Sequence, residues 1–269
     1  MRTCLARSAL LAPWLFLPLL IALPSPAGAE SAEEVGLQIA AEARERERGF
    51  GDFTAVQTMV LRNKQGQESR RQLRIKVLEV DGGGDKSLFV FDEPRAVKGT
   101  ALLIHAHAKK ADDQWLYLPA LKRVKRISSS NRSGSFMGSE FSYEDLGAQE
   151  VEKYSHRYLR EEGCGDSTCT LVETVPVEKG SGYSRRVVWR DRDELRVRKI
   201  DYYDRKDAHL KTLTVAGYER YLDRYWRTAE MTMVNHVTGK STVLTWTDYQ
   251  FRTDLDERDF TRTGLRRVR

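Results

Sequence analysis

The sequence predicts a mainly β protein with few helices, built on one long antiparallel sheet. Three observations lead to this prediction. An apolar N-terminal stretch of export type precedes the body of the chain. One helical pattern follows it, and from about residue 53 onward apolar and polar residues alternate with a period of two. Turn residues recur about every ten residues, which is typical of a sandwich or barrel.

Residues 1–29 are predicted to be a secretory signal peptide. Arg2 and Arg7 give a positive start, Leu10–Leu23 is apolar, and Ala27–Ala29 is a small-residue cleavage site. A transmembrane anchor is the alternative, but prolines interrupt the run and a polar chain follows it. We therefore expect a single domain over residues 30–269 that works in the periplasm.

Charge and length restrict the classes of function. The chain has 269 residues and a formal charge of +6, which falls to +4 without the two signal arginines. Basic and acidic residues are interspersed, as on an ordinary soluble surface, so a nucleic-acid partner is not expected. We expect a monomer, and no motif calls for a cofactor.

The helix is predicted over Ser31–Arg48. Ser31 is a suitable N-cap, and acidic residues in the first turn interact favourably with the positive end of the helix dipole. Val35, Ile39 and Ala43 form a narrow apolar stripe, and Gly49 follows as a stop signal.

The strands follow from alternation. Val56, Thr58 and Val60 share one face, and Leu73, Ile75 and Val77 share the next. Further predicted strands are Leu88–Phe91, Ala101–Ala106, Gln114–Leu118, Val124–Ser128, His156–Glu162, Thr170–Val175, Ser184–Arg190, Val197–Tyr203, Leu210–Tyr221, Trp226–Val234 and Thr242–Phe251. The serine-rich stretch Ser128–Gly138 breaks the rhythm and is predicted to be a long, mobile loop, with a short helical or irregular turn at Phe141–Leu146.

Two cysteines remain in the exported chain. Cys164 and Cys169 flank a Gly-Asp-Ser-Thr turn, and in an oxidising compartment such a pair is most simply a disulfide. Four intervening residues do not match the two-residue spacing of a redox site.

Four segments resemble a known family: Glu93–Leu103, Gln114–Pro119, Arg123–Ile127 and Ser135–Leu146. Together they are similar to the periplasmic outer-membrane lipoprotein-sorting proteins, the relatives of the carrier LolA, over about residues 31 to 262. The resemblance implies a curved, unclosed antiparallel half-barrel with the N-terminal helix and lid segments over its concave face. It also implies a carrier for acyl chains of a lipoprotein or lipid in outer-membrane transport, with an inner-membrane transporter and an outer-membrane acceptor as partners.

Adaptable apolar side chains are the candidates for such a cavity or its lid, although each also suits ordinary core packing. They are Trp115, Tyr117, Phe136, Met137, Phe141 and Tyr143. Arg123, Lys125 and Arg126 form a basic edge, which is either a solvated strand face or a contact for anionic headgroups or an acidic partner. A non-catalytic adaptor with a self-filled core, docking on an envelope transporter, is the second hypothesis.

Enzymatic and metal sites have little support. His105 and His107 would share one strand face, but spacing supplies no third ligand, so no metal is expected. Paired carboxylates such as Asp112-Asp113 point apart on a strand or are solvated in turns. The serines at 128–135 have no local histidine, so an envelope hydrolase is the weakest hypothesis.

Overall fold

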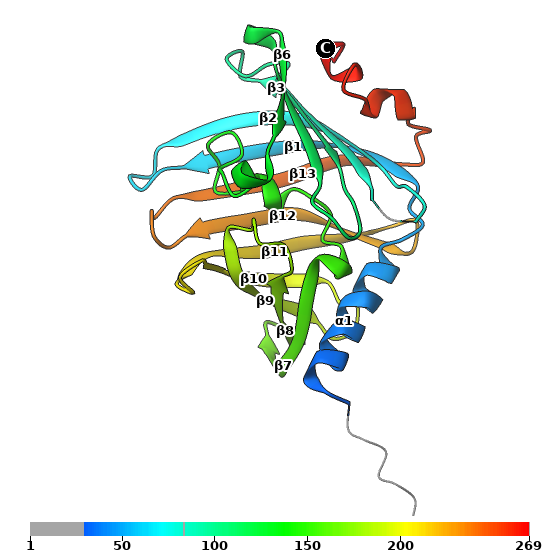
Figure 1. Cartoon of the computed structure of the whole chain (residues 1–269), viewed down its shortest axis with the longest axis vertical. Helices are drawn as coiled ribbons and strands as arrows, with labels where there is room; N and C mark the ends of the chain where they lie inside the picture. Colours follow the sequence, from blue (N-terminus) through cyan, green and yellow to red (C-terminus); the bar gives the residue numbers. More distant parts are fainter. Residues whose placement is uncertain (1–29, 83, 269) are drawn as a thin grey trace, which may run out of the picture. The chain divides into compact units, whose positions relative to one another are not determined.

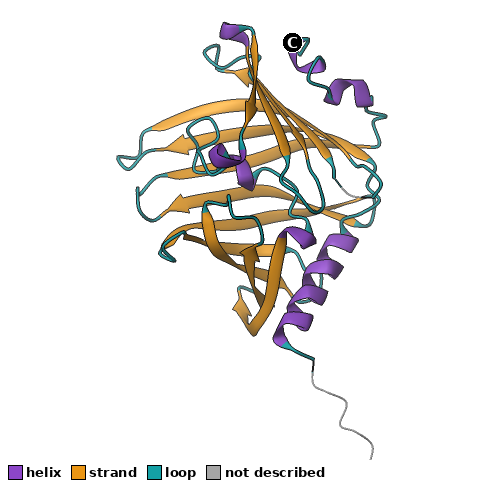
Figure 2. Ribbon diagram, viewed as in Figure 1, coloured by secondary structure: helices purple, strands orange, loops and turns teal. Residues whose placement is uncertain are grey.

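The computed structural model describes residues 30–82 and 84–268. The expected signal peptide lies outside these residues. Contacts group Ser31–Arg269 as one unit, built around a thirteen-stranded antiparallel sheet (Figures 1 and 2). The strands are β1 (Asp52–Arg62), β2 (Glu68–Leu78), β3 (Lys86–Glu93), β4 (Ala101–His105), β5 (Asp113–Leu118), β6 (Arg123–Ile127), β7 (Tyr154–Cys164), β8 (Ser167–Pro176), β9 (Tyr183–Asp191), β10 (Val197–Asp204), β11 (His209–Tyr221), β12 (Tyr225–Asn235) and β13 (Ser241–Phe251).

The sheet consists of two meanders joined at one seam. Its order runs from β6 through β1, then from β13 to β7, so the first and last strands pair in the middle. Val60 faces Val243 and Phe53 faces Phe251 across this seam. No pairing joins β6 to β7 within the described residues. The sheet is therefore curved but unclosed, which confirms the predicted half-barrel.

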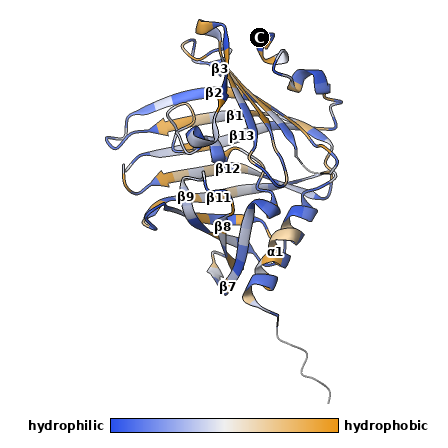
Figure 3. Cartoon of the chain, in the orientation of Figure 1, coloured by the Kyte–Doolittle hydropathy of each residue, from blue (hydrophilic) through white to orange (hydrophobic). Residues whose placement is uncertain are grey.

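Helix α1 (Ala32–Arg46) lies beside β7 (Figure 1). Ser31 caps it through a capping box, since its hydroxyl accepts from the Glu34 N–H at 3.1 Å and the Glu34 carboxylate accepts from the Ser31 N–H at 2.8 Å. The helix carries both hydrophilic and hydrophobic residues (Figure 3). Gly36 lets it approach the sheet closely, because a Cβ there would lie 2.7 Å from the backbone nitrogen of Tyr158.

The alternation of the strands gives the sheet two apolar faces. The largest buried cluster lies on the concave face and includes Leu73, Phe91, Leu102 and Met233. A second cluster on the opposite face is covered by the C-terminal 3-10 helices η5 (Glu257–Phe260) and η6 (Gly264–Arg266). A third, smaller cluster contains Cys169, Leu171, Val187 and Trp189.

The disulfide prediction is confirmed. Cys164 and Cys169 are bonded, with Cα atoms 5.7 Å apart, and they close the hairpin between β7 and β8. Closing a loop this short contributes roughly 2 kcal/mol in the chain-entropy model.

The segment after β6 differs from the predicted open loop. Between β6 and β7 it contains the short 3-10 helices η2 (Ser129–Asn131), η3 (Tyr143–Asp145) and η4 (Val151–Lys153), and η1 (Pro119–Leu121) lies between β5 and β6. Phe136 within it is 1% exposed and Phe141 is 3% exposed. Serine and glycine content alone indicated mobility, but these two aromatic side chains anchor the segment in the concave core. The predicted turn at Phe141–Leu146 corresponds to η3.

No helix within residues 30–82 and 84–268 is long and apolar enough to cross a membrane.

Candidate functional site

A cavity of about 500 Å³ lies between α1 and the concave face of the sheet. Its walls come from α1, from strands of both meanders and from the segment just after η3. Ile39 and Ala43 of α1 face Ile75 and Val77 of β2 across it. The volume falls within the range of small-molecule sites, roughly 300–1,000 Å³.

The floor of the cavity is an apolar row that crosses several strands. Val172 on β8 pairs with Val188 on β9, which pairs with Ile200 on β10. Because alternate residues of a strand share a face, this register points all three side chains at α1. Met231 and Trp246 extend the apolar surface toward the seam strands.

Five arginines also line the cavity, and three of them have carboxylate partners. A buried ion pair compensates each charge for the loss of water. The three pairs are Arg44–Glu150 at 2.9 Å, Arg196–Asp191 at 2.8 Å and Arg227–Glu47 at 2.5 Å.

The other two arginines, Arg186 and Arg190, flank Val188 on β9. Arg186 is 6% exposed; its Nε donates to Thr174 Oγ1 at 3.2 Å, Nη1 donates to Gln149 Oε1, and the group lies 4.0 Å from the Tyr154 ring centroid. Arg190 donates from Nη1 to the Leu195 carbonyl oxygen at 3.0 Å. In the described part of the chain, neither guanidinium has a carboxylate within ion-pair distance. Burial lowers the pKa of Arg190.

Two ring nitrogens at the cavity have no hydrogen-bond partner among the described residues. Trp226 Nε1 is buried and lacks an acceptor. His156 Nε2 donates to the Val151 carbonyl oxygen at 2.9 Å, so Nδ1 is the bare nitrogen of a neutral ring. Burial lowers the pKa of His156, which favours that neutral form.

The rest of the concavity is filled by residues 135–146, which we call the plug. Phe136 packs with its ring centroid 5.7 Å from that of Phe91 and 5.6 Å from that of Tyr143. Phe141 joins the same cluster. The side chains of the plug therefore fill a part of the concavity that the open sheet would otherwise expose.

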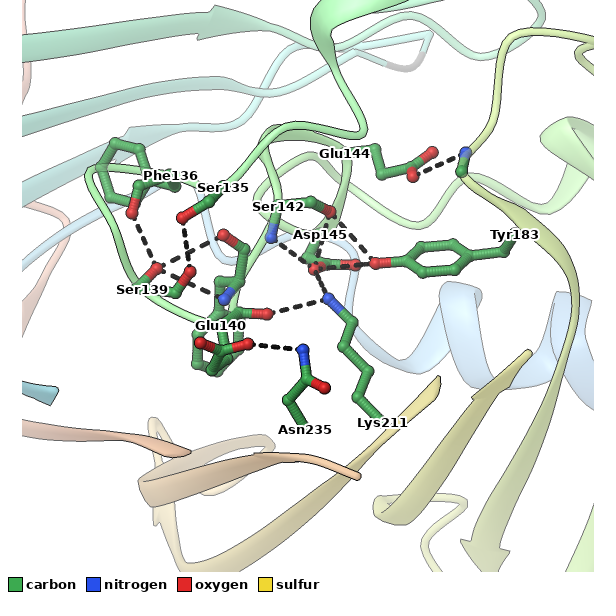
Figure 4. Close-up of polar contacts among 12 residues, drawn as sticks. Ser135, Phe136, Ser139, Glu140, Ser142, Glu144, Asp145, Tyr183, Lys211 and Asn235 are labelled. Atoms are coloured by element: carbon green, nitrogen blue, oxygen red, sulfur yellow. Dashed lines mark hydrogen bonds and ion pairs between the residues drawn. The ribbon is translucent and has the colours of Figure 1, made fainter. Parts of the chain in front are cut away.

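A buried polar network anchors the plug to the second meander (Figure 4). Lys211 Nζ lies 2.7 Å from Asp145 Oδ2, with side chains 5% and 3% exposed. The Tyr183 hydroxyl donates to Asp145 Oδ1 at 2.9 Å, and Asn235 Nδ2 donates to Glu140 Oε2 at 2.7 Å. Burial, reinforced by Asp145, raises the pKa of Tyr183 well above its usual value.

The residues predicted to bind a ligand separate into two groups. Phe136, Met137, Phe141 and Tyr143 come together in and beside the plug and pack against the concave core. Trp115 and Tyr117 lie on the opposite face, in the cluster under Phe260. None of the six lines the cavity next to α1.

The predicted basic edge lies on β6, at one margin of the sheet. Arg123, Lys125 and Arg126 are exposed there, and Arg126 pairs with Asp113 at 2.5 Å. The neighbour of β6 in the sheet is β5, whose Leu116 and Tyr117 pair with Lys125 and Val124.

The two histidines of the His105-x-His107 motif do not share a strand. β4 ends at His105, whose Nε2 lies 2.7 Å from the Phe260 carbonyl oxygen. His107 Nε2 lies 3.0 Å from Asp113 Oδ2. Residues 30–82 and 84–268 contain no group of three potential ligands that would hold a metal ion.

Sequence reasoning missed the cavity arginines. The signal was present, because Arg186, Val188 and Arg190 alternate on a predicted strand and must share a face. Two charges on the same face as a buried valine indicate that this face is not ordinary solvent-exposed surface.

Comparisons with known proteins place the chain in a family. A family model described only as "-like: Uncharacterized protein" matches residues 83–267, and no curated protein matches the sequence. A crystal structure of a "putative outer membrane lipoprotein-sorting protein domain" from Vibrio parahaemolyticus is 53% identical, with a TM-score of 0.85 over 87% of this chain and 99% of that one.

Two further crystal structures are similar. A DUF1329 family protein from Desulfovibrio piger is 29% identical, with a TM-score of 0.84 over 88% of this chain and 100% of the other. The LolA superfamily protein NE2245 from Nitrosomonas europaea is 20% identical, with a TM-score of 0.69 over 88% of this chain and 100% of its own, and shares the fold. The chain belongs to the outer membrane lipoprotein-sorting protein family, with a LolA-like fold.

Proposed function

We propose that this protein is a periplasmic carrier that holds an acyl chain of a lipid or lipoprotein in the cavity beneath α1. Export through a cleaved signal peptide at residues 1–29 and a role in outer-membrane transport belong to the same proposal. The observation that carries it is the apolar row Val172–Val188–Ile200, which lines a cavity of about 500 Å³ at the margin of the concave core.

The energetics suit reversible binding. Burying an acyl chain contributes about 0.8 kcal/mol per methylene, so a sixteen-carbon chain offers roughly 12 kcal/mol before costs. Association and ordering cost about 4–15 kcal/mol. The net affinity is expected to be around the micromolar range, which permits both uptake and release without covalent chemistry.

A matched pair of substitutions on β9 tests the proposal. Val188 and Val187 are neighbours with side chains on opposite faces, at the cavity and in the third cluster respectively. Val188→Trp fills the cavity, so we expect uptake of fluorescent fatty acid to fall at least about tenfold while the unfolding free energy changes by less than about 1.5 kcal/mol.

Val187→Trp is the control. It overpacks a filled cluster and should cost about 1–3 kcal/mol of stability while leaving uptake by the folded fraction unchanged. Uptake that is equal in the Val188→Trp variant and the wild type contradicts an acyl site in this cavity.

The adaptor alternative has one observation in its favour. Phe136 and Phe141 fill part of the concavity from within the chain. If native mass spectrometry of gently purified protein shows no bound lipid, and fatty acids and phospholipids do not bind, a docking role on an envelope transporter becomes the better explanation.

A further inference from the structure

The arginines of the cavity differ in their partners. Asp85 and Glu194 also line it, but Asp85 pairs with Arg44 alongside Glu150, and Glu194 lies 4.0 Å from Arg46. Arg44, Arg196 and Arg227 each meet a carboxylate, whereas Arg186 and Arg190 meet none among the described residues. The acidic groups near Arg190 are already engaged, because Glu47 pairs with Arg227 and Asp191 pairs with Arg196. Two cations at this wall therefore have no carboxylate within ion-pair distance among the described residues.

Arg186 is buried and Arg190 is half-buried. A guanidinium that has lost water without gaining an anion is costly. Arg190 is the less satisfied of the two. A guanidinium has five N–H donors, and the only acceptor that Arg190 reaches among the described residues is the Leu195 carbonyl oxygen. Arg186, by contrast, is stacked on Tyr154 and donates to two neutral side chains.

A second donor is available at the same cavity. Trp226 Nε1 is buried without an acceptor. Trp226 and Arg190 line the same cavity, and the Trp226 ring lies 4.3 Å from the guanidinium of Arg196. An indole N–H and a guanidinium fork are both donors, so the group that satisfies them must be an acceptor and, beside a cation, an anion.

We infer that the cavity selects an anionic amphiphile, whose carboxylate or phosphate headgroup binds Arg190 with help from Arg186 and Trp226 Nε1 while its chain lies on the Val172–Val188–Ile200 row. This inference rests on the proposed carrier function and names the class of its ligand. The headgroup is thus held inside the cavity wall, beside the acyl chain.

The test compares ligands with the same number of chain carbons and either an anionic or a neutral headgroup. Ligand-free protein is titrated with palmitate and with hexadecanol, and separately with dipalmitoyl phosphatidic acid and dipalmitoylglycerol, and complexes are measured by native mass spectrometry. We expect each anion to bind about tenfold or more tightly than its neutral counterpart, the range of a charge-assisted hydrogen bond. The first pair reports on carboxylate and the second on phosphate.

Arg190→Gln should remove most of that preference while leaving the affinity for the neutral ligands unchanged. Arg185→Gln is the matched control, because Arg185 lies on the same strand but pairs outside the cavity with Asp207 at 2.8 Å, and its preference should stay that of the wild type. Trp226→Phe, which removes the N–H together with the five-membered ring, should lower anion affinity severalfold more than neutral-ligand affinity and serves if Arg190→Gln does not fold.

The outcomes separate the two proposals. If neither the anionic nor the neutral member of either pair binds, the carrier function itself is wrong. If all four bind but charge makes no difference, or if Arg190→Gln and Trp226→Phe leave the preference intact, the carrier function stands and the headgroup inference is overturned.

Discussion

The two halves of the concavity differ in how their cations are paired. At the plug, Lys211 has the carboxylate of Asp145 at 2.7 Å, and aromatic side chains fill the space around it. Beneath α1, Arg190 has no such partner among the described residues and faces a cavity. Both halves use β9, which contributes Tyr183 to the plug and Arg190 to the cavity. One half is complete within the chain, and we propose that a ligand completes the other.

The largest expected effect breaks the complete half. Lys211→Met leaves Asp145 buried without its cation, so the unfolding free energy should fall by about 3–5 kcal/mol. Urea denaturation monitored by circular dichroism measures this loss. Arg190→Met is the comparison, because it removes an unpaired charge and should change stability by less than about 1 kcal/mol or increase it. Equal losses in the two variants would mean that the halves do not differ.

A smaller effect is expected where α1 covers the cavity. Gly36→Leu places a side chain within 3 Å of the β7 backbone at Arg157 and Tyr158, so the helix must move away. Overpacking of this kind costs about 1–3 kcal/mol, and the wider cavity should release bound fatty acid faster in stopped-flow measurements. Ala41→Leu on the exposed side of α1 is the control and should alter neither the unfolding free energy nor the release rate of fatty acid. An unchanged release rate in Gly36→Leu would show that α1 is not the cover.

The smallest effect concerns pH. Burial raises the pKa of Glu144 in the plug, although its carboxylate accepts from Gly182 N at 2.9 Å. In the pH window between the unfolded and the raised folded pKa, the folded state binds more protons, so stability falls as pH rises through that window.

Glu144→Gln should remove this contribution. Relative to the variant, the wild type should therefore lose unfolding free energy as the pH rises above about 4.5. A difference that does not depend on pH would mean that the plug does not perturb this carboxyl.

The sequence allowed the local structure to be predicted but not the long-range pairings. Alternation located β11 at Leu210–Tyr221, one residue short of the observed strand, and Ser31 located the start of α1. The seam between β1 and β13 joins residues almost 200 positions apart, which no local pattern encodes. The half-barrel followed from the resemblance to a family, not from periodicity.

The site was harder to predict for a physical reason. Phe136 was identified as unusual for its loop, but whether it lines a cavity or fills a core depends on Phe89 and Phe91, far away in sequence. The importance of Arg190 lies in a missing partner, and the sequence, rich in acidic residues, gives no sign of which carboxylates are already paired. The structure shows that Glu47 is paired with Arg227 and Asp191 with Arg196, so neither carboxylate is left for Arg190.

An unclosed sheet keeps free margins, and β6 forms one of them. Unpaired backbone groups at such a margin invite strands of other molecules to add, which leads to aggregation. Arg123, Lys125 and Arg126 project from this strand, so a second copy approaching in the same way would bring cation against cation. The basic margin thus opposes edge-to-edge pairing of two copies along β6.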